Sequence, residues 1–407
     1  MKYLILGLGK SGMAAYHLLK NEGHEVAGYD DDPSLQEGLT GSSVTPPTLD
    51  PFECIVVSPG FSPSHPFYQS ALLKGKKVIS EVELALTRLN QPSLAITGTN
   101  GKTTVTLLVT HILNHAGLQA KSLGNIGTPV ASYIAQPQEI LVIELSSFQL
   151  ERLEGRFFDS GVILNITPDH LDRYPTLESY AETKCRLQQL IKPQGSLWVH
   201  EQILREFPFL LSAKVQSYGN SFELILPTRY KGHDRENIIA AWLLCRAFGV
   251  SMERFLAALE GFCFPPHRME RIASINEVVY INDSKSTNID ATIKGVETLE
   301  GRVILIVGGV HKGSSYRPWR ISFAHKVIQI LAIGSASSLI EEELSDLYPI
   351  KCYPSLQEAF LQAKQIASPG DTVLFSPGCS SFDQFKDYVQ RGNLFKKYVL
   401  EEGKNEP

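Results

Sequence analysis

The chain has 407 residues, 43% of them hydrophobic and 20% charged, which is typical of a globular protein of two or three domains. Its formal net charge of −5 argues against a general nucleic-acid-binding protein. No apolar stretch approaches the roughly 20 residues that a membrane helix needs. The six cysteines are scattered without a C-x-x-C pair, so they indicate neither a disulfide framework nor a metal site. We therefore expect a cytoplasmic α/β protein with reduced thiols.

The first segment, residues 1–90, alternates between strand and helix patterns. Strands are expected at 3–6, 26–29 and 54–57, with a helix at 11–21 between the first two. Such alternation predicts a parallel sheet with right-handed crossovers.

Glycines follow the first of these strands in the pattern Gly7-x-Gly9-x-x-Gly12, and Asp30 ends the second strand. This spacing matches the dinucleotide fingerprint, which alone would indicate a nicotinamide-dependent dehydrogenase. A tight turn that binds another diphosphate, or nothing, produces the same pattern. The residues by themselves leave both interpretations open.

A second glycine turn lies at residues 97–104, which read Thr-Gly-Thr-Asn-Gly-Lys-Thr-Thr and follow an apolar strand. A strand, a glycine turn and a helix that opens with lysine form a cradle for phosphate groups. Lys102 can reach the terminal phosphates, and the Thr103 hydroxyl can bind Mg²⁺. The loop is a short form, since the first glycine of the standard motif would fall at Ile96. It predicts ATP binding.

The second segment, residues 91–268, continues with strands expected at 140–143, 161–164 and 197–200. Helices are expected at 180–191, 236–248 and 254–259. Polar residues stand at the ends of its strands. Glu144 follows a strand beside the phosphate loop, which favours a Mg²⁺ ligand over a surface glutamate. His170 lies among acidic residues after the next strand, so a metal or acid–base role and a structural role remain equally open.

Lys184 lies on one helical stripe with Tyr180, Leu187 and Ile191. A lysine on the inward face is costly unless it is paired or chemically altered. Periodicity alone favours a side chain that extends to solvent.

The third segment, residues 269–407, returns to strand–helix alternation, with strands expected at 278–281, 303–307, 328–333 and 373–375 and a frayed tail at 401–407. Arg268 follows Pro265-Pro266 at a domain junction, where it would clamp a phosphate or form a salt bridge. Dense polar groups follow two of the strands, at 281–288 and 376–385. Cys379, within the second group, is interpreted as a packed thiol.

Taken together, these motifs resemble the Mur ligases, ATP-dependent amide ligases that build the peptide stem of peptidoglycan. The resemblance runs from Gly7 to Asn393. The segments 144–150, with Phe148 where relatives tend to have His, 282–288 and 376–385 are similar to the member that adds D-glutamate to UDP-N-acetylmuramoyl-L-alanine. The resemblance implies a Rossmann-like domain for the UDP substrate at 1–90, a central P-loop ATPase-like domain with a mostly parallel sheet at 91–268, and a Rossmann-like amino-acid-binding domain at 269–407.

The resemblance also implies ligands and roles. It implies ATP, two Mg²⁺ ions, small-molecule substrates and a monomer. Residues facing the UDP substrate would be Gly9, Lys10, Ser11, Gly12, Asp30, Asp31, Ser58, Pro59, Gly60 and Asn125. Those binding ATP would be Gly98, Thr99, Asn100, Gly101, Lys102, Thr103, Thr104, Asn237, Arg268 and Asp283. The D-glutamate pocket would contain Lys285, Thr287, Lys312, Ser381, Phe382 and Phe385. The metal ligands would be Thr103, Glu144, His170 and, if carbamylated, Lys184; the expected catalytic residues are Lys102, Glu144, His170 and Lys184.

Two departures from the family pattern and three alternatives accompany this resemblance. Asp234 stands where the family usually has Asn, and Val310 where relatives often have Asp. A sister ligase, including a folylpolyglutamate-type enzyme, would differ around Phe148 and Ser381. A nicotinamide-dependent dehydrogenase would leave Lys102 without a role. A nucleotide switch should carry a guanine-reading Asn-Lys-x-Asp motif, which this sequence lacks.

Overall fold

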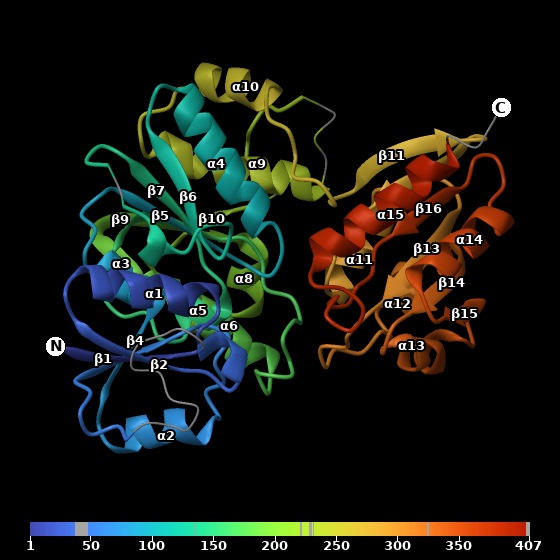
Figure 1. Ribbon diagram of the computed structural model, residues 1–407. Coiled ribbons are helices and arrows are strands. Elements are labelled where there is room, and N and C mark those ends of the chain that lie inside the picture. The colour runs from blue at the N-terminus through green and yellow to red at the C-terminus, as the bar shows by residue number, and fades with distance from the viewer. Residues whose placement is uncertain are drawn as a thin grey trace. The chain divides into compact units, whose positions relative to one another are not determined.

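The computed structural model describes residues 1–36, 48–134, 136–219, 222–227, 230, 232–323 and 325–403. Their strands form three β-sheets, and helices connect the strands. The chain divides into two compact units (Figure 1). The first unit contains Met1–Ile166 and Tyr180–Phe262, and the second contains Thr167–Ser179 and Cys263–Pro407. The first two sheets belong to the first unit, and the third sheet belongs to the second.

The first sheet has four parallel strands in the order β2-β1-β3-β4. They are β1 (Lys2–Leu6), β2 (Glu25–Tyr29), β3 (Cys54–Val57) and β4 (Lys77–Ser80), connected through α1 (Lys10–Asn21), η1 (Pro33–Gln36) and α2 (Pro66–Leu73), and followed by α3 (Glu81–Leu86). Tyr3 and Ile5 pack into one core and Leu4 and Leu6 into another, because successive side chains point to opposite faces. The predicted parallel sheet is confirmed.

The second sheet has six parallel strands in the order β10-β9-β8-β5-β7-β6. The strands are β5 (Ser93–Thr97), β6 (Ala120–Gly124), β7 (Ile140–Glu144), β8 (Phe158–Ile163), β9 (Ile191–His200) and β10 (Gln216–Tyr218). The other elements are α4 (Lys102–His115), η2 (Val130–Ser132), α5 (Ser147–Leu150), α6 (Leu177–Cys185), α7 (Leu187–Leu190), α8 (Glu201–Glu206), η3 (Pro208–Leu210), α9 (Gly232–Arg246) and α10 (Met252–Glu260). Apolar side chains of α4, α9 and α10 cover one face, and this layer fixes the helix that follows the phosphate loop.

The helix predicted at 180–191 is largely present but is divided at Arg186 and ends one residue early. Helix α6 ends at Cys185, α7 covers only Leu187–Leu190, and Ile191 already pairs with Phe158 in the sheet. Pro193 disfavours helix at Lys192 and cannot donate a helical hydrogen bond, so the helical stretch does not continue into β9. Sheet pairing overrides the helical apolar pattern here.

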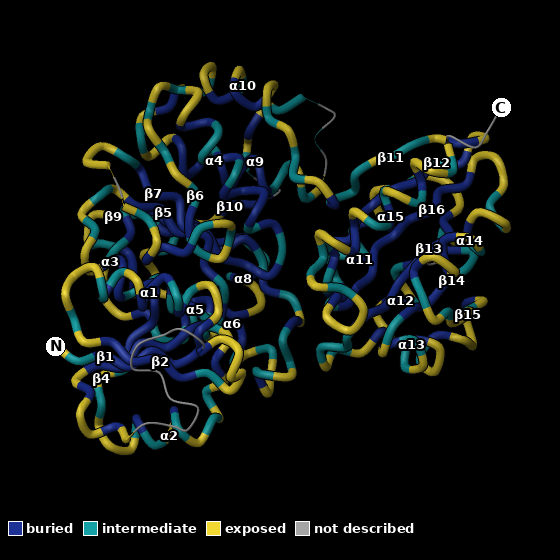
Figure 2. Tube along the Cα trace, viewed as in Figure 1, coloured by how far each residue is buried: buried dark blue, intermediate teal, exposed yellow. Residues whose placement is uncertain are grey.

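The third sheet has six strands in the order β11-β12-β16-β13-β14-β15, with β11 antiparallel to β12 and the other pairs parallel. The strands are β11 (Glu270–Ile275), β12 (Val278–Asn282), β13 (Val303–Gly308), β14 (Val327–Ile333), β15 (Ile350–Tyr353) and β16 (Thr372–Phe375). The helices are α11 (Ile289–Glu297), α12 (Trp319–Ser322), α13 (Ser337–Leu344), α14 (Leu356–Ile366) and α15 (Tyr388–Glu402). Separate apolar cores lie on the two faces of this sheet, and Figure 2 shows the buried strands within it.

The C-terminal end of the chain is more regular than the sequence predicts. The expected frayed tail is partly wrong, because α15 continues through Glu402; residues 404–407 lie outside the described part of the chain. All six cysteines have free thiols, as expected. Among the described residues, no helix is both long and apolar enough to cross a membrane.

Candidate functional site

The turn between β5 and α4 is shaped by two glycines with positive φ. Gly98 has φ 153° and Gly101 has φ 86°. A Cβ atom on Gly101 would lie 2.4 Å from Oδ1 of Asn237, and one on Gly98 would lie 2.9 Å from Cβ of Leu164. Only glycine fits both the backbone conformation and the space, so the loop passes close to the end of the neighbouring strand.

Hydrogen bonds hold this phosphate loop and its lysine. Asn165, just beyond β8, accepts from the backbone N–H of Asn100 through Oδ1 at 2.8 Å and donates through Nδ2 to the Asn100 carbonyl at 3.1 Å. Lys102 Nζ donates to the carbonyl oxygens of Gly98 and Thr99, each at 2.7 Å. The ammonium therefore lies within the loop at the N-terminus of α4, which is the arrangement expected of a phosphate site.

Glu144 is the last residue of β7, which pairs with β5, and it is only 2% exposed to solvent. Its Oε1 accepts from Asn125 Nδ2 at 2.8 Å, whereas its buried Oε2 has no hydrogen-bond partner among the residues that the structure describes. Burying a carboxylate oxygen without a donor is unfavourable, so this atom suits a cation. Glu144 pairs with Ile96, close to the end of the strand that leads into the phosphate loop, and a carboxylate oxygen is the donor type that Mg²⁺ prefers. The residues present fit a magnesium ion.

Lys184 on α6 lies inside the same unit. It is 1% exposed, Nζ donates to the Gly98 carbonyl at 2.9 Å, and the ammonium is 4.6 Å from the centroid of the Tyr180 ring. The solvent-reaching side chain that periodicity favoured is therefore wrong. Contacts with a carbonyl dipole and an aromatic face stabilise the buried charge. The carbamylation of Lys184 stays a prediction.

The first glycine turn also has a defined geometry. A Cβ on Gly12 would lie 1.8 Å from the Gly7 carbonyl oxygen, and that same oxygen accepts from Ser58 Oγ at 2.7 Å. Asp30 Oδ2 accepts from the backbone N–H of Leu8 at 2.5 Å. Asp30, which is predicted to face the uridine, therefore stabilises the glycine turn through a hydrogen bond to its backbone.

Most of the remaining residues predicted for the UDP substrate follow strands of the first sheet, whereas Asn125 follows β6 of the second. Gly9 caps α1, whose first residues are Lys10 and Ser11, and Lys10 Nζ donates to the Gly127 carbonyl. Asp31 Oδ1 accepts from the Tyr29 hydroxyl at 2.9 Å, and Pro59 and Gly60 follow β3. Lys10 therefore joins the first sheet to the turn that contains Asn125.

In the second unit, Asp283 follows β12 and is buried. It accepts from Ser286 Oγ at 2.5 Å, Ser376 Oγ at 2.8 Å and the Met269 N–H at 3.2 Å. Burial raises its pKa to about 6 because desolvation outweighs these hydrogen bonds and the charge of Arg268.

The residues predicted for D-glutamate lie on loops that follow three strands of the third sheet. Lys285 donates to the Tyr388 hydroxyl at 2.9 Å, and its ammonium lies 4.4 Å from the centroid of that ring. Ser381 is buried, whereas Phe382 is 74% exposed. The other members of this group are Thr287, Lys312 and Phe385.

Lys312 pairs with a residue of the segment 167–179, which belongs to the same unit. Its Nζ lies 3.1 Å from Asp169 Oδ1. His170 has φ 55°, and its Nε2 lies 3.6 Å from Asp169 Oδ2. Across the described ranges, no three His, Cys, Asp or Glu side chains form a group that could hold a metal ion. The second metal site expected at His170 stays a prediction.

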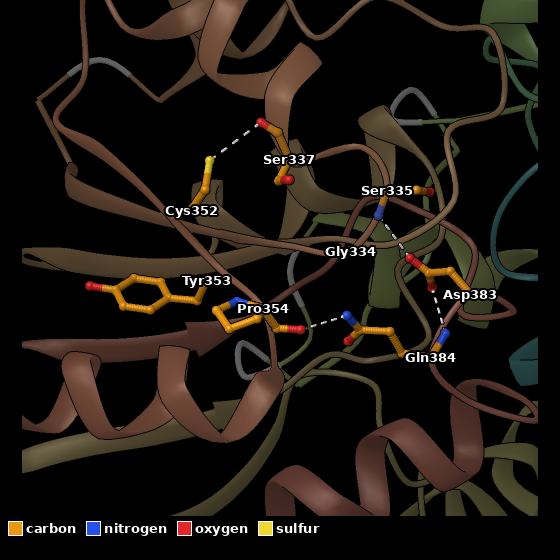
Figure 3. A pocket seen from close by; sticks show the side chains of 8 residues that line it. All are labelled: Gly334, Ser335, Ser337, Cys352, Tyr353, Pro354, Asp383 and Gln384. Carbon is orange, nitrogen blue, oxygen red and sulfur yellow. Dashed lines mark hydrogen bonds between the residues drawn. The ribbon is translucent and has the colours of Figure 1, made fainter.

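A shallow hollow of about 450 Å³ borders the loop that contains Phe382 (Figure 3). Asp383 Oδ2 accepts from the Ser335 N–H at 2.9 Å, and Gln384 Nε2 donates to the Pro354 carbonyl at 2.9 Å. These bonds attach the loop to the ends of β14 and β15.

Sequence reasoning missed Arg391, a fully buried arginine on α15. Its guanidinium donates to Ser284, Cys379 and Ser380, which all lie on the loops predicted to bind D-glutamate. Its burial could have been inferred from the sequence, because Arg391 shares one helical face with the apolar residues Phe395 and Val399, one and two turns further on.

The two residues that depart from the family pattern lie at the third sheet and on α9. Val310 pairs through its backbone with Ser380, at 2.8 Å and 3.1 Å, so this bridge does not depend on its side chain. Asp234 lies in the first turn of α9, where a carboxylate interacts favourably with the helix dipole.

Known proteins match this chain over nearly its whole length. A family model described as the Mur ligase middle domain matches residues 96–221, and one described as the Mur ligase, glutamate ligase domain matches residues 267–379. A UDP-N-acetylmuramoylalanine–D-glutamate ligase of Protochlamydia amoebophila is 42% identical, covering 98% of this chain and 97% of the relative. The enzyme of the same name from Chlamydia pneumoniae is 36% identical, covering 98% of each chain.

Solved structures show the same fold at low identity. The UDP-N-acetylmuramate–alanine ligase MurC of Thermotoga maritima aligns over 100% of both chains with a TM-score of 0.61 and 17% identity. The MurF ligase of that organism, solved in complex with ADP, covers 86% of this chain and 90% of its own, with a TM-score of 0.60 and 16% identity.

Proposed function

The chain belongs to the Mur ligase family, and on this premise we propose that it is an ATP-dependent amide ligase of peptidoglycan synthesis. Its substrates would be UDP-N-acetylmuramoyl-L-alanine and D-glutamate. The observation that carries this proposal is the 42% identity, across nearly the whole chain, to a relative named for that reaction. The glycine turn at Gly7–Gly12 would then bind the substrate diphosphate rather than a nicotinamide cofactor.

The phosphate loop supports the ATP part of the proposal. Lys102 and the N-terminus of α4 would bind the terminal phosphates, because an ammonium and the backbone N–H groups at the start of a helix are donors that suit phosphate oxygens. Asn237, packed against Gly101, would contact the nucleotide. Glu144 and Thr103 would hold Mg²⁺, which when bound neutralises phosphate charge. A second ion near His170 and a carbamylated Lys184 belong to the same proposal.

The chemistry requires activation of a carboxylate, since an unactivated carboxylate does not react with an amine at neutral pH. The alanyl carboxylate attacks the γ-phosphorus of ATP; a bond forms from carboxylate oxygen to phosphorus, and the bond to ADP breaks. Lys102 offsets the charge of these converging anions. The D-glutamate amine then attacks the acyl carbon of the acyl phosphate, losing a proton, and inorganic phosphate leaves as the amide forms.

The amino acid brings two carboxylates, which need cations and hydroxyl groups. Lys285 and Lys312 would supply charge, and Thr287 and Ser381 would supply hydroxyl groups. Phe382 and Phe385 would line the pocket. The domain boundaries at 1–90, 91–268 and 269–407, a monomeric state and a cytoplasmic location, where ATP is present, complete the proposal.

A phosphate-release assay tests this function. We expect ATP-dependent release of phosphate that requires UDP-N-acetylmuramoyl-L-alanine and D-glutamate together. Release that requires a different amino acid, such as L-lysine, would favour a sister ligase of the same family. NAD reduction without any need for ATP would instead favour a dehydrogenase.

A further inference from the structure

The guanidinium of Arg391 lies where the loops after three neighbouring strands meet. Strands β12, β16 and β13 are consecutive in the third sheet and parallel, so their C-terminal ends share one edge. We call the loops that follow them, residues 283–288, 376–387 and 309–318, the three strand-end loops. All six residues proposed for D-glutamate lie on them: Lys285, Thr287, Lys312, Ser381, Phe382 and Phe385.

Arg391 bonds directly to two of these loops. Nη2 donates to the Ser284 carbonyl at 2.9 Å and to the Cys379 carbonyl at 3.1 Å. Nη1 donates to the Ser380 carbonyl at 3.3 Å, and Nε donates to Ser284 Oγ at 3.1 Å. One planar side chain therefore fixes the separation between the residue before Lys285 and the residue before Ser381.

The third loop joins through the backbone that Arg391 holds. Ser380 exchanges hydrogen bonds with Val310 at 2.8 Å and 3.1 Å. Gly309 passes so close that a Cβ there would lie 3.1 Å from Nη1 of Arg391 and 2.1 Å from the Ser380 carbonyl oxygen. The position of the loop that carries Lys312 is therefore fixed relative to the other two loops.

Arg391 carries a positive charge that is completely buried, which distinguishes it from an ordinary core residue. Arg391 is 0% exposed, and desolvation lowers its pKa to about 10, so the side chain stays charged at neutral pH. Among the described residues, no carboxylate lies within 4.0 Å of its guanidinium, and its acceptors are three carbonyl oxygens and one hydroxyl. A buried charge without an ion pair is costly, and an apolar residue would fill the space without that cost.

We propose that Arg391 is a positioning residue for the amino-acid substrate. It acts through the three strand-end loops and sets the geometry of the groups that receive the two carboxylates. This inference rests on the proposed function and goes beyond it, because Arg391 itself is not assigned to the pocket.

The test compares Arg391→Lys with the parent in the full chain. The substitution keeps the charge but loses the planar fork, so we expect the KM for D-glutamate to rise about 10-fold or more, as two or more charged hydrogen bonds are lost. The acyl phosphate can be trapped by hydroxylamine in the absence of D-glutamate. We expect the rate of hydroxamate formation and the KM for ATP to change by less than about twofold.

Matched variants separate positioning from folding. Arg320→Lys, in an ion pair with Asp346 at 2.5 Å in the same unit, should leave all three parameters unchanged. If Arg391→Lys does not fold, Ser284→Ala removes one acceptor of Arg391 and should raise the same KM by a smaller factor.

Two results would overturn the inference: an unchanged KM for D-glutamate in a folded variant, or equal losses in ligation and hydroxamate formation. A parent enzyme without D-glutamate-dependent phosphate release would instead count against the proposed function. The two failures are therefore distinguishable.

Discussion

Nζ of Lys184 lies 2.9 Å from the carbonyl oxygen of Gly98, so a lysine of α6 contacts the first glycine of the phosphate loop. Gly98 also accepts from Lys102 at 2.7 Å. Two ammonium groups thus share one carbonyl oxygen, that of Lys184 being buried and that of Lys102 half-buried. This concentration of positive charge would be offset by phosphate groups, or by a carbamate on Lys184.

Replacing Lys184 tests this arrangement. We expect Lys184→Ala to lower kcat by about 100-fold or more, because both its charge and its contact with the loop are lost. Steady-state ligation kinetics measure the effect. Lys121→Ala, at an exposed position of β6, is the matched control and should retain parental kcat. A parental kcat in Lys184→Ala would contradict the assignment.

Glu144→Gln keeps the shape of the side chain and removes its charge. We expect the Mg²⁺ concentration for half-maximal activity to rise about 10-fold or more, because the unpartnered Oε2 is the proposed ligand. A magnesium titration of activity measures this shift. Glu53→Gln, at an exposed position outside the site, should show the parental requirement. An unchanged titration in Glu144→Gln would remove Glu144 from the metal site.

Gly101→Ala tests the phosphate loop itself. At φ 86° a Cβ is strained, and it would also lie 2.4 Å from Oδ1 of Asn237. We expect a loss of about 1–3 kcal/mol in the free energy of unfolding and a higher KM for ATP. Denaturant unfolding and ATP titration measure the two effects. Gly117→Ala is the control, since Gly117 has a similar φ of 82° but open space around it, and it should affect stability alone.

The buried carboxyl of Glu81 predicts a dependence of stability on pH. Burial raises its pKa from 4.5 to about 7, and the hydrogen bond from the Ala131 N–H at 2.7 Å offsets this only in part. Between these two pKa values the folded state binds a proton that the unfolded state has lost. The contribution of Glu81 to stability therefore falls as pH rises from about 4.5 to 7.

Glu81→Gln removes this titration. The free energy of unfolding of the parent, minus that of the variant, should decrease from pH 5 to pH 8. Chemical denaturation at several pH values measures this difference. A difference that stays constant over that range would show that Glu81 is not buried as an isolated acid.

Much of the site could be predicted because its residues stand at strand ends. Glu144 follows an apolar run next to the phosphate loop, and parallel strands bring their C-terminal ends to one edge. Confirmed strands such as 54–57 have continuous apolar runs. The burial of Lys184 was not settled by periodicity, since a stripe shows which face a residue occupies but not what covers that face.

Other features depend on tertiary contacts that a local pattern does not contain. Strand β11 was missed because its residues are mostly polar and partly exposed, and its pairing with β12 defines it. The break before Ile191 arises from pairing with Phe158. Arg391 lies 107 residues after Ser284, and only the fold brings the two together.

The choice of amino acid is the central claim, and a competition experiment tests it most directly. The enzyme is given ATP and UDP-N-acetylmuramoyl-L-alanine with equal concentrations of D-glutamate, L-glutamate, L-lysine and a diamino acid. Mass measurement and chiral analysis of the hydrolysed product identify the added residue. We expect D-glutamate to be the amino acid incorporated. Incorporation of L-glutamate, L-lysine or the diamino acid at a comparable rate would contradict the proposed specificity.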